Sequence, residues 1–284
     1  MLTNCELPNC MLDKNIELND FDFVLYHLYL NNPTYKEYYQ KIRREHPERM
    51  MILDNSAYEF SVNGQRLDMD AFVECIKELK PDYYILPDVL GNFQATIDGV
   101  TEFIEKYHDI FRTIYMKPVN AGHSIQPLAV IQGNSYEDLS TCLEYYFNLG
   151  IGYIGIPFHL PFYKELMIPD DVRDVFKKYY LDTYTSEDIR YAMGRVKWVL
   201  DNKDYLKCFS KVHFLGSHCP LEKFFYSDYK SMDTGYPVKL GIEGITLFQE
   251  KEKPNIILDH FIDKPLDTNI KDIIESNIYF FKNL

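Results

Sequence analysis

The segment Lys230–Gly244 reads KSMDTGYPVKLGIEG, and it joins a short apolar strand to a turn through a single aspartate, Asp233. Two other segments repeat the pattern: MMILDNSAYEF ends its apolar run on Asp54, and YYILPDVLGN ends its run on Asp88. A carboxylate directly after an apolar run is costly to desolvate unless a partner or a substrate compensates for it. The fold therefore matters, because it decides whether these three strand ends meet.

The composition predicts a folded protein of the size of one α/β barrel. Its 284 residues are 46% apolar and 15% aromatic, which provides a sizeable core and argues against disorder. No apolar run approaches the length that crosses a bilayer. The first residues also lack the basic and apolar segments of a secretory signal. We therefore expect a cytoplasmic protein with no membrane partner.

Cysteines and charge exclude further classes. The six cysteines are scattered without a CxxC pair, which indicates reduced thiols and argues against a disulfide scaffold or an iron–sulfur cluster. The net charge of −13 argues against a general nucleic-acid coat protein but leaves room for a local basic face. Basic residues gather in Lys36–Arg49 and at Arg190, Arg195 and Lys197. A solvated helix face and a nucleic-acid track both remain open for them.

Strand-like and helix-like segments alternate along the chain. The helix-like segments carry apolar residues on one face, and Asn92 and Ser135 are placed to cap two of them. The predicted strands are Asp22–Leu28, Met50–Asp54, Tyr83–Asp88, Pro127–Gly133, Gly152–Pro157, Lys211–Ser217, Tyr229–Asp233 and Pro254–Phe261.

This alternation predicts a (β/α)8 barrel of the TIM type, with insertions in the βα loops, as a single domain over residues 1–284. The connection 110–126 is long enough to contain a further strand or hairpin. A doubly wound open sheet is the alternative fold. No glycine-rich phosphate fingerprint follows the first predicted strand, which favours the barrel.

In such barrels the chemistry lies at the carboxyl ends of the strands. The predicted ends present three carboxylates, Asp54, Asp88 and Asp233, and the amide of Gln132. Two carboxylates roughly 5 Å apart are the apparatus of retaining glycosyl transfer, in which one attacks the anomeric carbon and the other handles the proton. A third carboxylate can accept hydrogen bonds from a ring N–H and an adjacent amine, as on guanine. The alternative is that each aspartate only caps a helix or starts a turn.

Six ordered segments carry a resemblance to a known family: LDNSAYEF, LPDVLGN, AVIQGNS, GYIGIP, HFLGSH and MDTGYPVKLGIEG. Together they resemble the tRNA-guanine transglycosylase superfamily, and most closely its shorter, virus-associated branch, which places 7-deazaguanines in DNA. The segments span about Met51–Gly244, and their order and spacing carry the resemblance. It implies that Asp233 is the nucleophile and that Asp54 is the general acid and base.

The same resemblance implies a set of base-binding residues. Asp88 would read the purine edge, and Gln132 and Gly133 would contact the same base. Gly155 and Ile156, on the glycine-bearing strand, would line the base pocket. Two aromatic residues, Tyr58 and Phe158, are candidates either for stacking on a base or for the core.

The sequence departs from the tRNA enzymes in three ways. They usually carry DSGG where this chain has Asp54-Asn55-Ser56-Ala57, a bulkier turn that would narrow or reshape the base pocket. Their structural zinc site has no counterpart, because no cysteine follows Cys219. We also expect no separate RNA-binding domain. These departures favour DNA over tRNA as the substrate.

The implied reaction is a base exchange through a covalent aspartate–deoxyribose intermediate, with DNA and a free 7-deazaguanine base as partners. It requires no organic cofactor and no metal, and Lys239 is a candidate contact to a phosphate. The resemblance leaves room for a homodimer, and the acidic charge leaves room for an accessory DNA-binding protein. If the chain is viral, its location would be the host cytoplasm.

Other functions remain open at this stage. The same chemistry could act on tRNA, and a glycosidase would use water in place of the incoming base. A metal-dependent hydrolase would combine His213, His218 and His260 with Asp54 or Asp233. A binding protein without catalysis is disfavoured by the two carboxylates, because binding alone needs no nucleophile.

Overall fold

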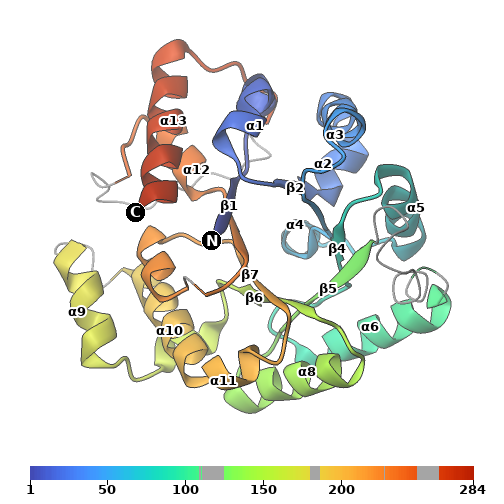
Figure 1. Ribbon diagram of the computed structural model, residues 1–284, viewed down its shortest axis with the longest axis vertical. Helices are drawn as coiled ribbons and strands as arrows, with labels where there is room; N and C mark the ends of the chain where they lie inside the picture. Colours follow the sequence, from blue (N-terminus) through green and yellow to red (C-terminus); the bar gives the residue numbers. More distant parts are fainter. Residues whose placement is uncertain (109, 111–124, 180–185, 227, 248–261) are drawn as a thin grey trace. The chain divides into compact units, whose positions relative to one another are not determined.

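Eight strands form one sheet in the computed structural model of the protein (Figure 1), in the order β1-β8-β7-β6-β5-β4-β3-β2. The paired strands run parallel, and helices lie between them along the chain. A doubly wound sheet would reverse its strand order at a switch point, and this order does not. The predicted (β/α)8 class is therefore confirmed. The strands are β1 (Leu2–Cys5), β2 (Asp22–Leu25), β3 (Met51–Asp54), β4 (Tyr83–Ile85), β5 (Gln126–Val130), β6 (Tyr153–Pro157), β7 (Lys211–Leu215) and β8 (Ser231–Thr234).

The structure describes residues 1–108, 110, 125–179, 186–226, 228–247 and 262–284. Seven predicted strands overlap observed ones, while the predicted strand 254–261 lies outside the described residues, as does most of the connection 110–126. The strand Leu2–Cys5 was not predicted. It pairs with β8, where Asn4 lies opposite Asp233.

The predicted strand Asp22–Leu28 was wrong at its end. Strand β2 stops at Leu25, and helix α2 begins at Tyr26. The residues Tyr26, His27 and Leu28 are buried, so they continue the apolar run although the backbone has turned into a helix. A short apolar run does not distinguish a strand from a buried helical turn.

The chain packs as two compact units, of which the central unit comprises residues 21–155. Strands β2, β3 and β4 are mostly apolar and, apart from the half-buried Asp54, buried, and the helices pack in neighbouring pairs: α3 against α5, and α6 against α8 (Figure 1). The helices are α2 (Tyr26–Asn31), α3 (Pro33–Glu45), α4 (Ala57–Val62), α5 (Met69–Leu79), α6 (Phe93–Lys106) and α8 (Tyr136–Asn148).

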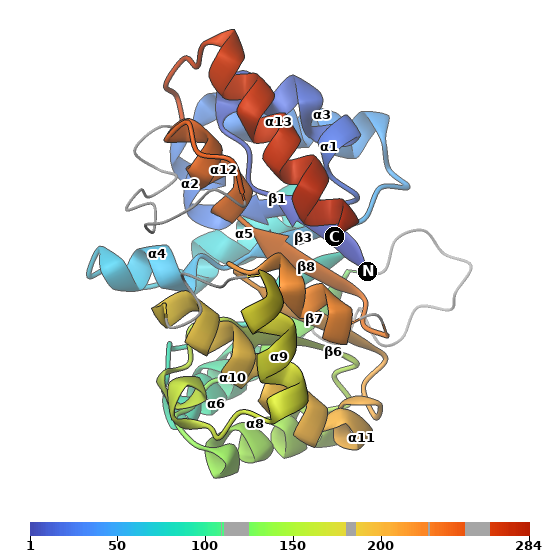
Figure 2. The same ribbon diagram turned by 90° about the vertical axis from the view of Figure 1, so that its left-hand side faces the viewer.

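The terminal unit comprises residues 1–20 and 156–284. Its C-terminal helix packs along α12, and α9 lies beside α10 (Figure 2). The described part of the connection from β6 to β7 contains η2, α9 and α10 before α11, which is the kind of loop insertion that the sequence predicts. The elements are η1 (Asn9–Lys14), α1 (Asn15–Leu18), η2 (Pro161–Glu165), α9 (Asp170–Tyr179), α10 (Glu187–Asp201), α11 (Lys203–Leu206), η3 (Pro220–Phe225), α12 (Tyr236–Ile242) and α13 (Thr268–Asn283).

Polar caps fix where the longer helices start. The side chain of each cap accepts a hydrogen bond from a backbone N–H of the first turn, which would otherwise lack a partner. The predicted caps Asn92 and Ser135 are confirmed. The full set is Asn32, Asp68, Asn92, Ser135, Ser186 and Asp267.

Among the described residues, no helix combines the length and the apolar character needed to cross a membrane.

Candidate active site

In the terminal unit, Asp233 lies on β8 between two parallel neighbours, with β1 on one side and β7 on the other. Its side chain is 3% exposed. On β7, His213 is the residue in register with Ser231, and Ser231 is two positions before Asp233, so both point to the same face of the sheet. One imidazole can therefore reach both side chains.

His213 makes this bridge. Its Nε2 lies 2.9 Å from Oδ1 of Asp233, and its Nδ1 lies 2.8 Å from Oγ of Ser231. An ionised carboxylate only accepts hydrogen bonds, so Nε2 carries the proton, and the Nδ1 of a neutral ring accepts from the Ser231 hydroxyl. This arrangement fixes both the tautomer of His213 and the direction of the Asp233 carboxylate.

The turn after β7 also binds Asp233. The backbone N–H of Gly216 lies 3.2 Å from each carboxylate oxygen, and Gly216 adopts φ +64°, which favours glycine. The N–H of Ser217 donates to the carbonyl of Asp233 at 3.1 Å, and the hydroxyl of Thr234 donates to the carbonyl of Ser217. These hydrogen bonds hold residues 216–217 against the end of β8.

A buried ion pair supports this turn. Arg195 donates to both oxygens of Glu222, at 2.7 and 2.6 Å, and to the carbonyls of Leu215 and Ile156. Glu222 also accepts from the hydroxyl of Ser217 at 2.7 Å. The side chains of Arg195 and Glu222 are fully buried, so the interpretation of Arg195 as part of a solvated helix face or a nucleic-acid track is wrong.

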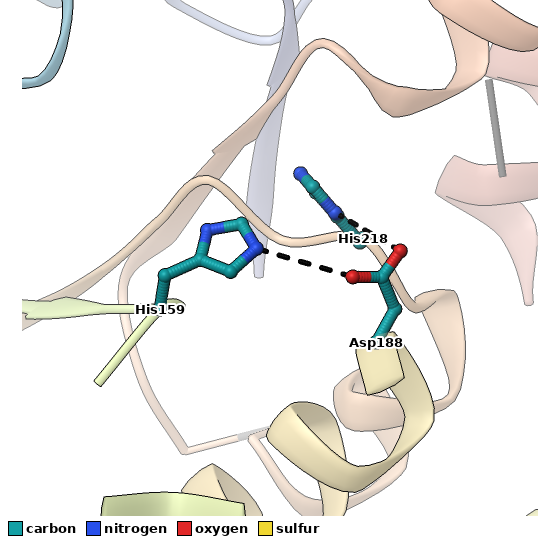
Figure 3. Close-up of side chains that lie close together, drawn as sticks. All are labelled: His159, Asp188 and His218. Atoms are coloured by element: carbon teal, nitrogen blue, oxygen red, sulfur yellow. Dashed lines mark ion pairs between the residues drawn. The ribbon is translucent and has the colours of Figure 1, made fainter. Parts of the chain in front are cut away.

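A second cluster lies on the same turn. His218 and His159, which follow β7 and β6, approach the carboxylate of Asp188 in the first turn of α10 (Figure 3). His159 Nε2 lies 3.9 Å from Oδ1, and His218 Nδ1 lies 3.5 Å from Oδ2. His218 also stacks on Tyr236, with ring centroids 5.3 Å apart. Burial lowers the pKa of His218 to about 4, so its ring is neutral at neutral pH.

Lys239, the candidate phosphate contact, lies on α12. Burial is the main cause of the lowered pKa of His218, and the positive charge of Lys239 is a smaller one. At the start of α12, an added Cβ at Gly235 would come within 2.9 Å of Glu6 and 3.1 Å of Lys239. Glycine at this position lets the ends of these two flexible side chains approach the backbone without shifting.

In the central unit, Asp54 ends β3 and shapes the turn that follows. Its Oδ2 accepts from the N–H of Ser56 at 2.7 Å, and Oδ1 of Asn55 accepts from the N–H of Ala57 at 2.8 Å. Ser56 adopts the left-handed φ of +58°. These are two successive side-chain-stabilised turns, so the turn-forming interpretation holds for Asp54, and the turn fixes the direction of its carboxylate.

Asp88, Asn55 and Gln132 form one network. Nδ2 of Asn55 donates to Oδ1 of Asp88 at 2.8 Å and to the carbonyl of Leu86 at 2.7 Å. Nε2 of Gln132 donates to Oδ2 of Asp88 at 2.6 Å, and its Oε1 accepts from Gly91. Burial raises the pKa of Asp88, against the opposing effect of the Asn55 and Gln132 hydrogen bonds. Each oxygen of this half-buried carboxylate is thus held by one side-chain amide.

The other residues predicted to bind the base are two glycines and a buried isoleucine. Gly133 adopts φ +153°, and an added Cβ would lie 2.3 Å from Cβ of Asp138, so only glycine fits. Gly155 pairs with Val130 across β5 and β6, and Ile156 is fully buried. Gln132 is 1% exposed, and its contacts make it a residue that positions Asp88.

The two aromatic candidates for base stacking differ in their exposure to solvent. Tyr58, on α4 just after the Asp54 turn, is 53% exposed. Phe158 is 2% exposed and packs against the guanidinium of Arg195 and the ring of His218. Phe158 is therefore a core residue, while Tyr58 remains available to a ligand.

The structure joins some of the predicted residues and adds others. It brings Asp88 and Gln132 together, and it bonds Asp88 also to Asn55, which sequence reasoning treated only as a departure from the family. Of the three histidines considered for a hydrolase, His213 bonds to Asp233 and His218 approaches Asp188, while His260 lies outside the described residues. Neither the models of known protein families nor the curated proteins include a match to this chain.

Proposed function

We propose that the protein is a guanine transglycosylase that exchanges guanine in DNA for a 7-deazaguanine base. The observation that carries the proposal is the arrangement around Asp88, because it suits one ligand edge in particular. A glycosidase acting on a neutral sugar needs no anchored carboxylate of this kind beyond its two catalytic groups.

Asp88 retains the capacity to accept two hydrogen bonds from a ligand. An ionised carboxylate has about four lone-pair sites, and Asn55 and Gln132 each use one. Guanine presents its ring N1–H and its exocyclic amine side by side, so one carboxylate can accept from both. A 7-deazaguanine presents the same edge, which would allow one site to serve the leaving and the entering base.

Asp233 has the environment of an oriented nucleophile. Oδ1 accepts hydrogen bonds from His213 Nε2–H and from the Gly216 N–H. Among the described residues, Oδ2 accepts only from the same Gly216 N–H. Oδ2 is therefore the oxygen proposed to attack C1′ of a deoxyguanosine. The C1′–N9 bond breaks as the C1′–O bond forms, and its electron pair leaves with N9.

Asp54 is proposed to handle the proton in both half-reactions. It donates a proton to the departing guanine and then takes the N9 proton of the incoming base. N9 attacks C1′, and Asp233 is released as a free carboxylate, so two displacements retain the configuration of the sugar. The target nucleotide must leave the stack, because its glycosidic carbon is otherwise covered. The chemistry uses no metal or organic cofactor.

The proposal is tested by incubating the protein with labelled guanine and, in parallel, double-stranded DNA, single-stranded DNA or tRNA. Incorporation into DNA supports the proposal, and incorporation into tRNA alone moves the activity to the tRNA alternative. Release of base without incorporation indicates a hydrolase. Failure of every substrate, with and without a DNA-binding accessory protein, overturns the proposal.

The role of each carboxylate is tested on denaturing gels. A covalent protein–DNA adduct should form in the native chain and in Asp204→Ala, a control at an exposed position, and should be lost in Asp233→Ala. Asp88→Asn should raise the KM for the base. Residues that act as a unit are not additive, so Asp54→Ala/Asp233→Ala should lose no more activity than either single variant. Full exchange by Asp233→Ala would contradict its role.

A further inference from the structure

Three metal-ligating side chains converge in the terminal unit, apart from the residues to which the proposed function assigns a role. They are His159, Asp188 and His218, and their ligand atoms all lie within 4.8 Å of one another. The two imidazoles approach different oxygens of the same carboxylate (Figure 3). The three residues come from a loop after β6, the first turn of α10 and the turn after β7.

The separations are too long for good hydrogen bonds and suit a shared ion. Contacts of 3.9 and 3.5 Å from Asp188 to the two rings exceed the usual donor–acceptor distance. Tetrahedral ligands at zinc-type bond lengths lie roughly 3.4 Å apart. The His218 contact already meets this spacing, and His159, with its side chain 40% exposed, has room to close the remaining gap.

The side chains of the cluster have the burial and the ring state that a metal ligand needs. Asp188 is buried, so its carboxylate acts on a cation with little screening by water. Among the described residues, the buried Nδ1 of His218 has no hydrogen-bond partner. Neutral imidazole is the form that binds metals, and a stacked contact with Tyr236 and a tilted contact with Phe158 hold the ring of His218.

We propose that His159, Asp188 and His218 bind a divalent transition-metal ion, with zinc the first candidate. Two imidazoles and one carboxylate form a donor set typical of zinc and of ferrous iron and unlike the all-oxygen sites of magnesium and calcium. The ligand atoms are Nε2 of His159, the carboxylate of Asp188 and Nδ1 of His218. The site does not depend on the transglycosylase proposal.

Three protein ligands leave at least one position open. Because His159 forms the exposed side of the cluster, the open position faces solvent there. The carboxylate neutralises only one of the two charges of the ion. Water or an oxyanion, such as a phosphate oxygen, is therefore the class of fourth ligand expected.

The test uses the full chain without a histidine tag. The chain is treated with a chelator and titrated with Zn²⁺, and separately with Co²⁺, whose visible spectrum reports coordination by nitrogen and oxygen. One equivalent should bind. His159→Ala, Asp188→Asn and His218→Ala should each weaken binding by at least about tenfold, the smallest loss expected even for an outer partner. His46→Ala, at a partly exposed histidine beside Glu48, should bind as the native chain does.

The three variants differ in how strongly they should affect folding, so a loss of metal binding can be distinguished from a loss of structure. His159→Ala changes a partly exposed side chain and should keep the native melting temperature, so weaker binding there reports the loss of a ligand. Failure of the native chain to bind zinc, cobalt, nickel, manganese or ferrous ions overturns the proposal. Binding that survives all three substitutions overturns it as well, since the ion would then lie elsewhere.

Discussion

The imidazole of His213 holds the carboxylate of Asp233 at 2.9 Å while its other nitrogen contacts Ser231. Both partners come from β8, two residues apart, and the ring spans them from β7. In the proposed reaction the nucleophile is therefore oriented by a neighbouring strand, a more rigid support than a loop. His213 is a positioning residue, because it acts on Asp233 and not on the substrate.

Replacing His213 should reduce exchange more than it reduces folding. His213→Ala removes the donor to Oδ1, and misplacement of the nucleophile should lower kcat by about 100-fold. His213→Gln can place an amide N–H near the former Nε2 and should recover part of the rate. Steady-state exchange kinetics on both variants measure this. Equal rates for the alanine and glutamine variants would show that the hydrogen bond has no such role.

Asn55→Ala should destabilise the fold through Asp88. The substitution leaves the carbonyl of Leu86 and one oxygen of Asp88 without the amide that they share, a loss of about 1–3 kcal/mol. The control Asn63→Ala changes an exposed residue at the end of α4 and should stay within about 0.5 kcal/mol of the native value. Urea unfolding measures both, and similar losses in the two variants would contradict the assigned role.

The pH dependence of stability should change in Asp88→Asn. Because burial raises the folded-state pKa of Asp88 above the ordinary 3.8, its contribution to stability is complete below that value. The contribution is lost as the pH rises through the raised pKa. The native chain should therefore lose stability relative to Asp88→Asn over this window. Unfolding at a series of pH values checks the prediction, and parallel profiles would refute it.

Gly133→Ala should cost more than a backbone penalty. At Gly133 the added methyl group meets Asp138 at 2.3 Å, whereas at Gly64, with φ +64°, it meets no described atom within 4 Å. Gly64→Ala should therefore show the cost of the left-handed backbone alone, about 1–2 kcal/mol. Gly133→Ala should add the overpacking cost of about 1–3 kcal/mol. Thermal unfolding compares them, and equal losses would contradict the steric argument.

Breaking the Arg195–Glu222 pair should be strongly destabilising. Glu222→Ala leaves a buried guanidinium without its carboxylate, at a cost of about 3–5 kcal/mol. The double variant Arg195→Met/Glu222→Leu removes both charges and should recover much of this loss. Chemical unfolding of the three proteins tests the coupling. If the double variant is less stable than Glu222→Ala, the attraction within the ion pair contributes more free energy than its desolvation costs.

The sequence predicts well those features that depend on strand ends. Asp88 and Gln132 close the apolar runs of β4 and β5, and parallel neighbours end at the same edge, so their meeting could be expected. The bond from His213 to Asp233 depends on register, which no local pattern specifies. The strand Leu2–Cys5 has only four residues of mixed polarity, and its burial comes from pairing with β8.

The histidine cluster is the feature that the sequence predicts least well. His159 and His218 follow different strands, and Asp188 lies in the first turn of a helix in the insertion between β6 and β7. No short spacing connects them, in contrast to the ligand pairs of metal-binding helices and knuckles. Tertiary packing of α10 against its neighbours brings them together.

The turn that contains Gly216 and His218 couples two carboxylates energetically. Its first residue donates to Asp233 and its third approaches Asp188, so the two carboxylates are tied to one short stretch of backbone. A ligand that reshapes this stretch at one carboxylate therefore changes the binding free energy at the other, and for two ligands at equilibrium the two effects are equal. A metal ion at the histidine cluster should change the affinity of a ligand at Asp233 by the same factor as that ligand changes the affinity of the metal ion.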